Sequence, residues 1–121
     1  MPPETSDRDA ALLLDVLLAA RDALGFVTAM DLPAFHASRL HRNAVIRSLE
    51  VLGEAAGQVS PGCRAANPDL PWRQMIALRN RLIHGYADVR AEVVWNVVQD
   101  HLPGLVAALT GLVPRDDPPS A

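Results

Sequence analysis

The amino-acid sequence predicts an all-α protein: an antiparallel four-helix bundle with short additional helical turns. Half of the 121 residues are apolar and few are aromatic, and Leu, Ala and Val dominate, which favours helices over strands. Apolar residues recur at helical spacing in successive segments, and no alternating pattern is long enough for a sheet. The length suits one domain with a single core, expected over residues 1–113, followed by a disordered tail at 114–121.

The first two helical segments are predicted on both sides of a break at "MDLPAF". The first runs from Asp7, a suitable N-cap, to about Phe26. The second begins at Asp31, carries Pro33 in its first turn and continues to about Val59. The expected buried stripes are Leu13, Val16, Leu17, Ala20, Leu24 and Val27 in the first segment, and Val45, Leu49, Leu52, Ala56 and Val59 in the second. A mixed face of the second segment, a candidate contact for another element or subunit, carries Leu40, Ala44, Arg47, Val51 and Glu54.

The remaining elements follow a loop. The stretch "SPGCRAANPDLP" contains three prolines and a glycine, so it is expected to be a loop in which one short turn can form. The third helix is predicted from about Pro71 to Gly85, because glycine suits a helix C-terminus. The fourth runs from about Val89 to Leu112, kinked or split at Pro103.

Composition and motifs exclude several classes of protein. The polar, acidic N-terminus is unlike a signal peptide, and the most apolar run is too short for a membrane span. With one cysteine, Cys63, a disulfide framework and a thiolate metal site are excluded, and a cytoplasmic location is the default. The histidines have no carboxylate at ligand spacing, so no metal is expected. No phosphate-binding loop or nucleophile elbow is present, so no cofactor is expected. Trp72 and Trp95 sit among aliphatic neighbours, which favours core packing over base stacking.

The charge is unevenly distributed along the chain. The net charge is −3, but residues 36–81 hold seven arginines against three acids, which gives +4. All eleven basic residues are arginine, the side chain best suited to bidentate phosphate contacts. Ordinary surface charge and a biased genome composition explain these features as well, so they favour phosphate binding only weakly.

The stretch "RNRLIHGY" carries the residues that call for a chemical explanation. Arg79 falls at the centre of the apolar stripe of the third helix, where a guanidinium group is costly to bury unless it is paired or lines a cleft. A purely structural interpretation is a snorkelling arginine, or a buried ion pair with an acid such as Glu54. His84 lies about 140° around the helix from Arg79. Either the helix ends at His84 and the ring swings back, or two subunits together complete a shared site.

These residues resemble the motif of HEPN-domain ribonucleases, in which an arginine and a polar residue precede a histidine by a short spacing. The final His-x-Tyr resembles the HepT-like branch. The resemblance extends over most of residues 8–112, through "FVTAMDLPAF", "VIRSLEVLGEAAGQVSP", "PWRQMIALRNRLIHGY" and "VVWNVVQDHLPGL". It implies an all-α HEPN-type bundle, and the motif positions show no departure from the family pattern.

The resemblance also implies a function. The expected protein is a homodimeric, metal-independent endoribonuclease, the toxin of a toxin–antitoxin pair with an MntA-like nucleotidyltransferase as antitoxin. Arg79 and His84 are then catalytic, and Asn80 and Arg81 support the RNA phosphate. The antitoxin is expected to attach AMP to Tyr86. Arg47 and Glu54 are weaker site candidates from the mixed face.

A second function class stays open at this point. The same Arg and His residues suit a non-catalytic helical adaptor that binds a nucleotidyltransferase and holds a nucleotide phosphate. Toxicity of this protein alone, lost on His84→Ala, fits the nuclease and not the adaptor. A purely structural bundle leaves Arg79 in the apolar stripe unexplained.

Overall fold

The computed structural model describes residues 5–85 and 89–113, and within them the chain is helical and has no strand. The predicted all-α class is therefore confirmed. The predicted tail at 114–121 lies outside the described residues. The helical elements are α1 (Asp7–Phe26), α2 (Leu32–Ala37), α3 (Arg39–Gln58), α4 (Pro61–Ala66), α5 (Trp72–Gly85), α6 (Ala91–Asn96), the π-helical segment η2 (Val97–His101) and α7 (Leu102–Thr110).

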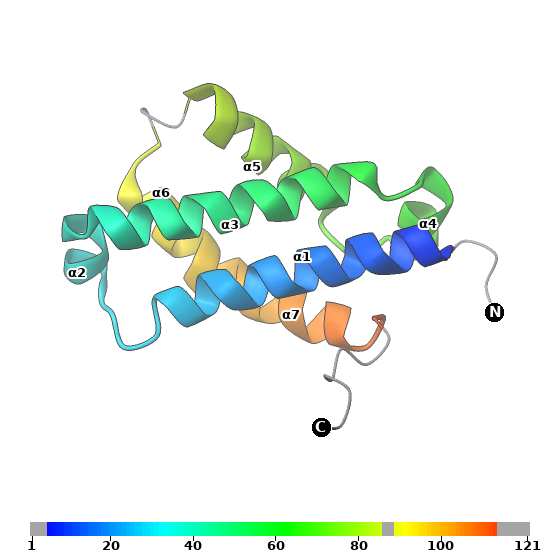
Figure 1. Ribbon diagram of the computed structural model, residues 1–121, viewed down its shortest axis with the longest axis horizontal. Helices are drawn as coiled ribbons and strands as arrows, with labels where there is room; N and C mark the ends of the chain where they lie inside the picture. Colours follow the sequence, from blue (N-terminus) through cyan, green and yellow to red (C-terminus); the bar gives the residue numbers. More distant parts are fainter. Residues whose placement is uncertain (1–4, 86–88, 114–121) are drawn as a thin grey trace.

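The long helices α1 and α3 form the centre of the bundle and run antiparallel to each other (Figure 1). α5 packs chiefly on α3, and α7 packs on the other side of α1. The continuous path α6–η2–α7 crosses behind α1 and α3, and α2 contacts this path at α6 (Figure 1). α5 is thus held mainly through one partner helix, and this contact positions the motif.

Side chains at the helix starts explain most of the element boundaries. α1 is capped by the hydroxyl of Ser6, which accepts from the N–H of Asp9 at 3.0 Å. The predicted cap, Asp7, is wrong by one residue, because the Ser6 hydroxyl reaches the free N–H at the third helical position. Asp31 caps α2 as predicted, accepting from the N–H of Ala34 at 2.9 Å, with proline in the first turn.

Three predicted boundaries need correction. The segment from Asp31 to Val59 is not one helix, because Ser38 is extended and its hydroxyl caps α3 instead of continuing α2. The loop before α5 contains a full short helix, α4. The fourth helix is interrupted upstream of Pro103 by η2, where the N–H of Leu102 donates to the carbonyl of Val97, five residues earlier. A proline lacks the N–H that would continue the regular ladder, so a widened turn before it is a physical response to that loss.

The core is built from the predicted stripes of α1 and α3. Every predicted member is buried except Leu24, which is half-buried. Trp95 is also half-buried and packs on Phe35, with ring centroids 5.4 Å apart, so core packing is confirmed for it. Within residues 5–85 and 89–113, no helix combines the length and apolar character that a bilayer span requires.

Asp9 is a buried carboxylate that ties the start of α1 to the start of α4. Ser60 donates to it twice, from its hydroxyl at 2.6 Å and from its N–H at 2.9 Å. These hydrogen bonds from Ser60 hold the pKa of Asp9 below its ordinary value of 3.8. The ionised form is therefore the one that stabilises the fold.

Replacing this carboxylate should weaken the fold in a pH-dependent way. Asp9→Asn should lower the free energy of unfolding by about 1–3 kcal/mol at neutral pH, because a charged acceptor of two hydrogen bonds is removed. Since the folded-state pKa is depressed, the wild-type contribution is complete above the ordinary pKa and is lost as the pH falls through the lowered one. Urea unfolding at pH 7 and pH 3 measures the difference. The exposed Asp22→Asn serves as control, and an equal loss at both pH values would contradict the prediction.

Candidate active site

A glycine in the middle of α3 lets α5 approach closely enough to seat the motif. A Cβ atom at Gly53 would lie 2.6 Å from the carbonyl oxygen of Met75 and closer still to the Cβ of Arg79. Any larger residue would push the two helices apart. The sequence contained a signal for this contact that was missed: a glycine in a helix interior costs stability, so it indicates a packing requirement.

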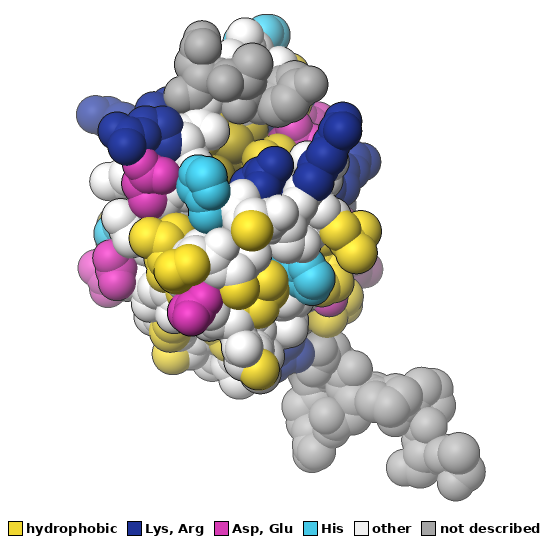
Figure 2. All heavy atoms as spheres, turned by 90° about the vertical axis from the view of Figure 1, so that its left-hand side faces the viewer, with side chains coloured by type: hydrophobic (Ala, Val, Ile, Leu, Met, Phe, Trp, Pro, Cys, Tyr) yellow, Lys and Arg dark blue, Asp and Glu magenta, His cyan; other side chains and the backbone are white. Residues whose placement is uncertain are grey.

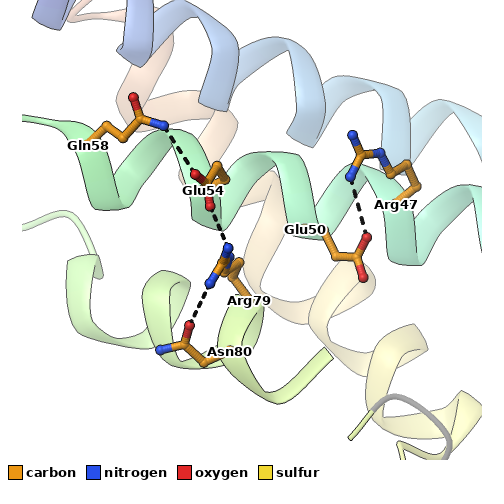
Figure 3. Close-up of polar contacts among 6 residues, drawn as sticks. All are labelled: Arg47, Glu50, Glu54, Gln58, Arg79 and Asn80. Carbon is orange, nitrogen blue, oxygen red and sulfur yellow. Dashed lines mark hydrogen bonds and ion pairs between the residues drawn. The ribbon is translucent and has the colours of Figure 1, made fainter. Parts of the chain in front are cut away.

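Arg79 lies over Gly53 and is held by polar groups from both helices (Figure 3). Its Nη2 atom is 2.8 Å from Oε2 of Glu54, and its Nη1–H donates to Oδ1 of Asn80 at 3.0 Å. The other carboxylate oxygen of Glu54 accepts from Gln58 at 3.2 Å. The Arg79 side chain is 30% exposed and that of Glu54 is 52% exposed. The guanidinium group is thus fixed in orientation while part of it faces solvent.

The expected pairing of Arg79 with Glu54 is confirmed, but the pair is not buried, and Arg79 also lines a cleft. Arg79 lines a groove of about 460 Å³ between α1, α3 and α5. Its charged lining consists of Asp15, Arg47, Glu50, Glu54 and Arg79. Nη1 of Arg47 is 3.6 Å from Oε1 of Glu50, so Arg47 also forms an ion pair, here within α3 (Figure 3). Three carboxylates against two guanidinium groups leave the groove without a net positive charge.

His84 does not join Arg79 within one chain. α5 continues to Gly85, so His84 is still helical, and its side chain is exposed and does not line the groove. Within the described part of the chain, no hydrogen bond or ion pair links it to the other motif residues. α5 is described as helical up to Gly85, and the imidazole does not swing back toward Arg79. This geometry favours the reading in which a second subunit completes the site.

The other predicted motif residues separate as well. Asn80 contacts the guanidinium group of Arg79 directly. Arg81 is exposed on a different side of α5 and lines an apolar cavity toward η2 and α7. Tyr86 lies outside the described residues. Among those that the structure describes, no group of three or more His, Cys, Asp or Glu side chains could hold a metal ion.

Exposed apolar side chains border the groove on all three helices. Leu18 on α1, Val51 on α3 and Ile83 on α5 are large hydrophobic residues that remain exposed. Val51 and Ile83 line the groove itself, and Leu18 lines a neighbouring hollow that shares Asp15, Arg47 and Val51 with it. Apolar side chains mixed with paired charges over several helices are typical of a protein–protein interface.

The close approach at Gly53 gives a test of the site. Gly53→Ala should lower stability by about 1–3 kcal/mol through overpacking and displace Arg79 from Glu54. Gly57→Ala, one turn later on the same helix, is the matched control, because its added Cβ would meet only Cγ1 of Ile76 at 3.8 Å. It should keep or raise the melting temperature, since alanine is the better helix former. Equal melting temperatures for the two variants would contradict the close-packing argument.

The chain is similar to a known protein family and to several known proteins. A family model described as "Ribonuclease HepT-like" matches residues 16–111, a range that includes the whole motif. "Putative RNase MJ1380" from Methanocaldococcus jannaschii is 37% identical over 99 residues, which cover 81% of this chain and 91% of that protein. "Probable ribonuclease HepT" from Thermococcus cleftensis is 40% identical over 62 residues, which cover 51% of this chain and 56% of that protein. No solved structure matches the chain.

Proposed function

Because the chain belongs to the HepT-like ribonuclease family, we propose that it is a metal-independent endoribonuclease that uses Arg79 and His84. The observation that carries the proposal is the placement of Arg79. Its guanidinium group is fixed by Glu54 and Asn80 and is partly open to a groove. A cation held in this way is organised before substrate arrives, as transition-state stabilisation requires.

The proposed reaction is a transesterification within the RNA. His84 takes the proton from a ribose 2′-OH, and the 2′ oxygen forms a bond to the adjacent phosphorus. The bond from phosphorus to the 5′ oxygen breaks, and that oxygen takes up a proton from water, while His84 later returns its proton to solvent. The products are a 2′,3′-cyclic phosphate end and a 5′-hydroxyl end. Arg79 stabilises the charge that grows on the phosphoryl oxygens, and the need for a 2′-OH restricts the reaction to RNA.

The active form is proposed to be a homodimer with composite sites. One chain leaves His84 outside the groove that holds Arg79. The face around this groove exposes Leu18, Val51 and Ile83, which a second copy would cover. In a symmetric dimer the same patch is used by both subunits, so His84 of each chain can approach Arg79 of the other.

The proposed biological role is that of a toxin controlled by a partner nucleotidyltransferase. The family resemblance supports AMP attachment at Tyr86, two residues after His84. A phosphate and a base added there would compete with RNA for the arginines of the motif and occupy the space beside His84. Neutralisation would then be electrostatic and steric, without a change of fold.

Cleavage of a defined RNA tests the proposal. Activity should survive EDTA, and the products should carry cyclic phosphate ends. It should vanish when the single ribose at the cut site is replaced by deoxyribose. The Arg79→Ala/His84→Ala double variant, purified in the same way, controls for contaminating nucleases. Robust cleavage by this double variant, or cleavage at the deoxyribose, would refute the assignment.

A further inference from the structure

Basic side chains gather at the end of the molecule where α2, α3 and α6 meet. A cavity of about 430 Å³ opens there, and its polar lining is His36, Arg39, Arg42 and Asn43. We call these four residues the basic end cluster. In the view onto this end, arginine side chains form separate groups on the left and the right of the upper half of the surface, and an acidic side chain lies below the left-hand group (Figure 2).

The α3 part of the cluster carries no acid of its own. No Asp or Glu occurs between Asp31 and Glu50, so the first turn of α3 carries no acid. The nearby start of α6 contributes Glu92, which forms an ion pair with Arg90, the N-cap residue of that helix. Arg42 donates to the backbone carbonyl of His36, which orients its guanidinium group without neutralising it. Arg39 is exposed, and no carboxylate pairs with it among the residues that the structure describes. Arg39 therefore presents its charge to solvent, and the half-buried Arg42 keeps a charge that its backbone partner does not neutralise.

The cluster shares a face of α3 with the glycine that seats Arg79. At about 100° per residue, Arg39, Asn43 and Gly53 fall within about 80° of one another on the helix. At about 1.5 Å per residue, roughly 16–21 Å of helix separates Gly53 from Arg42 and Arg39. A single RNA strand only a few nucleotides long can span that distance.

We propose that the basic end cluster binds the phosphate backbone of substrate RNA a few nucleotides from the scissile phosphate. The inference rests on the proposed nuclease function, and it answers a need of that function. The groove around Arg79 has more carboxylates than guanidinium groups, so it is poorly suited to attract a polyanion by itself. Arg39 and Arg42 supply bidentate phosphate contacts, while catalysis stays with Arg79 and His84.

Binding and cleavage are measured separately. Binding uses a labelled, fully 2′-deoxy oligonucleotide of the substrate sequence, which cannot be cleaved, titrated by fluorescence anisotropy over a range of salt concentrations. Arg39→Gln/Arg42→Gln should weaken binding by about tenfold. The plot of the logarithm of the binding constant against the logarithm of the salt concentration should become less steep, its slope falling in magnitude by roughly 0.7 for each phosphate that the protein no longer neutralises.

The matched control removes the same charge from the opposite end of α3. Arg8 donates to the carbonyl oxygen of Gln58, the last residue of α3, and the exposed Arg73 lies in the first turn of α5. Arg8→Gln/Arg73→Gln should leave the salt slope unchanged, because neither arginine belongs to the basic end cluster. A slope that flattens equally in both double variants would indicate attraction by total charge alone.

Substrate length gives the second readout. On a long RNA the cluster variant, Arg39→Gln/Arg42→Gln, should raise KM by about tenfold and leave kcat nearly unchanged. On a dinucleotide, which is too short to reach the cluster, kcat/KM should match the wild type. The inference would be overturned if the cluster variant had the same affinity and salt slope as the control variant. It would also be overturned if the cluster variant lost as much kcat/KM on the dinucleotide as on the long RNA. If the wild-type protein binds RNA through Arg39 and Arg42 but never cleaves it, the nuclease proposal fails and the binding surface stands.

Discussion

Mixing the Arg79→Ala protein with the His84→Ala protein should restore RNA cleavage to about one quarter of the wild-type rate, although each protein alone is inactive. Each single variant should lose cleavage by a factor of at least about 10²–10⁴, the usual contribution of a positioned acid–base or charge-stabilising group. Recovery follows from the separation of Arg79 and His84 within one chain. In a mixed dimer, one of the two composite sites keeps both residues.

The expected fraction comes from counting sites. Random exchange makes about half of the dimers mixed, and each mixed dimer has one intact site where the wild type has two. The control mixes wild-type protein with the Arg79→Ala/His84→Ala double variant. If each site is shared by two chains, this control mixture should have about one quarter of the wild-type activity, because a mixed dimer then has no intact site. If each site lies within one chain, the mixture should have about one half.

Two results would contradict this arrangement. A mixture of the single variants that stays inactive, with subunit exchange verified by mass spectrometry, would place both residues in a site formed by one chain. A monomer by light scattering at micromolar concentration, with cleavage intact, would remove the dimer from the mechanism. The melting temperature of His84→Ala should stay near that of the wild type, because the His84 side chain is exposed.

Tyr86→Phe should remain toxic and escape neutralisation by the partner nucleotidyltransferase. The substitution keeps the ring and removes the oxygen that would accept AMP. The catalytic pair is untouched, so cleavage by the purified variant should match the wild type. The effect should therefore appear only when the antitoxin is present, as loss of growth rescue.

Intact mass after co-expression provides the direct measurement. The wild-type protein should gain one or more units of about 329 Da, the mass that one AMP adds, and Tyr86→Phe should gain none. The catalytically inactive His84→Ala protein is the control, because it should still be modified at Tyr86. A wild-type protein that is fully neutralised without any gain in mass would show inhibition by binding alone.

Much of this fold was determined by the sequence through local signals. Apolar residues at helical spacing determined which faces of α1 and α3 are buried. Such residues form one stripe along each helix, and the stripe leaves water only when it faces the core. Asp31 marked the start of α2, because its side chain accepts a hydrogen bond from a free N–H of the first turn. The motif around Arg79 and His84, with the family resemblance it carries, indicated the function.

The tertiary structure decided what depends on residues distant in sequence. Gly53 and Arg79 are 26 positions apart, and only the packing of α5 on α3 brings them into contact. The acid that pairs with Arg79 was foreseen as one option, but its distance and exposure depend on how the two helices cross. Helical spacing predicted the angle between Arg79 and His84. Because α5 remains helical to Gly85, His84 lies outside the groove. A regular helix holds successive side chains at fixed angles, and tertiary packing decides which of those side chains faces a partner helix.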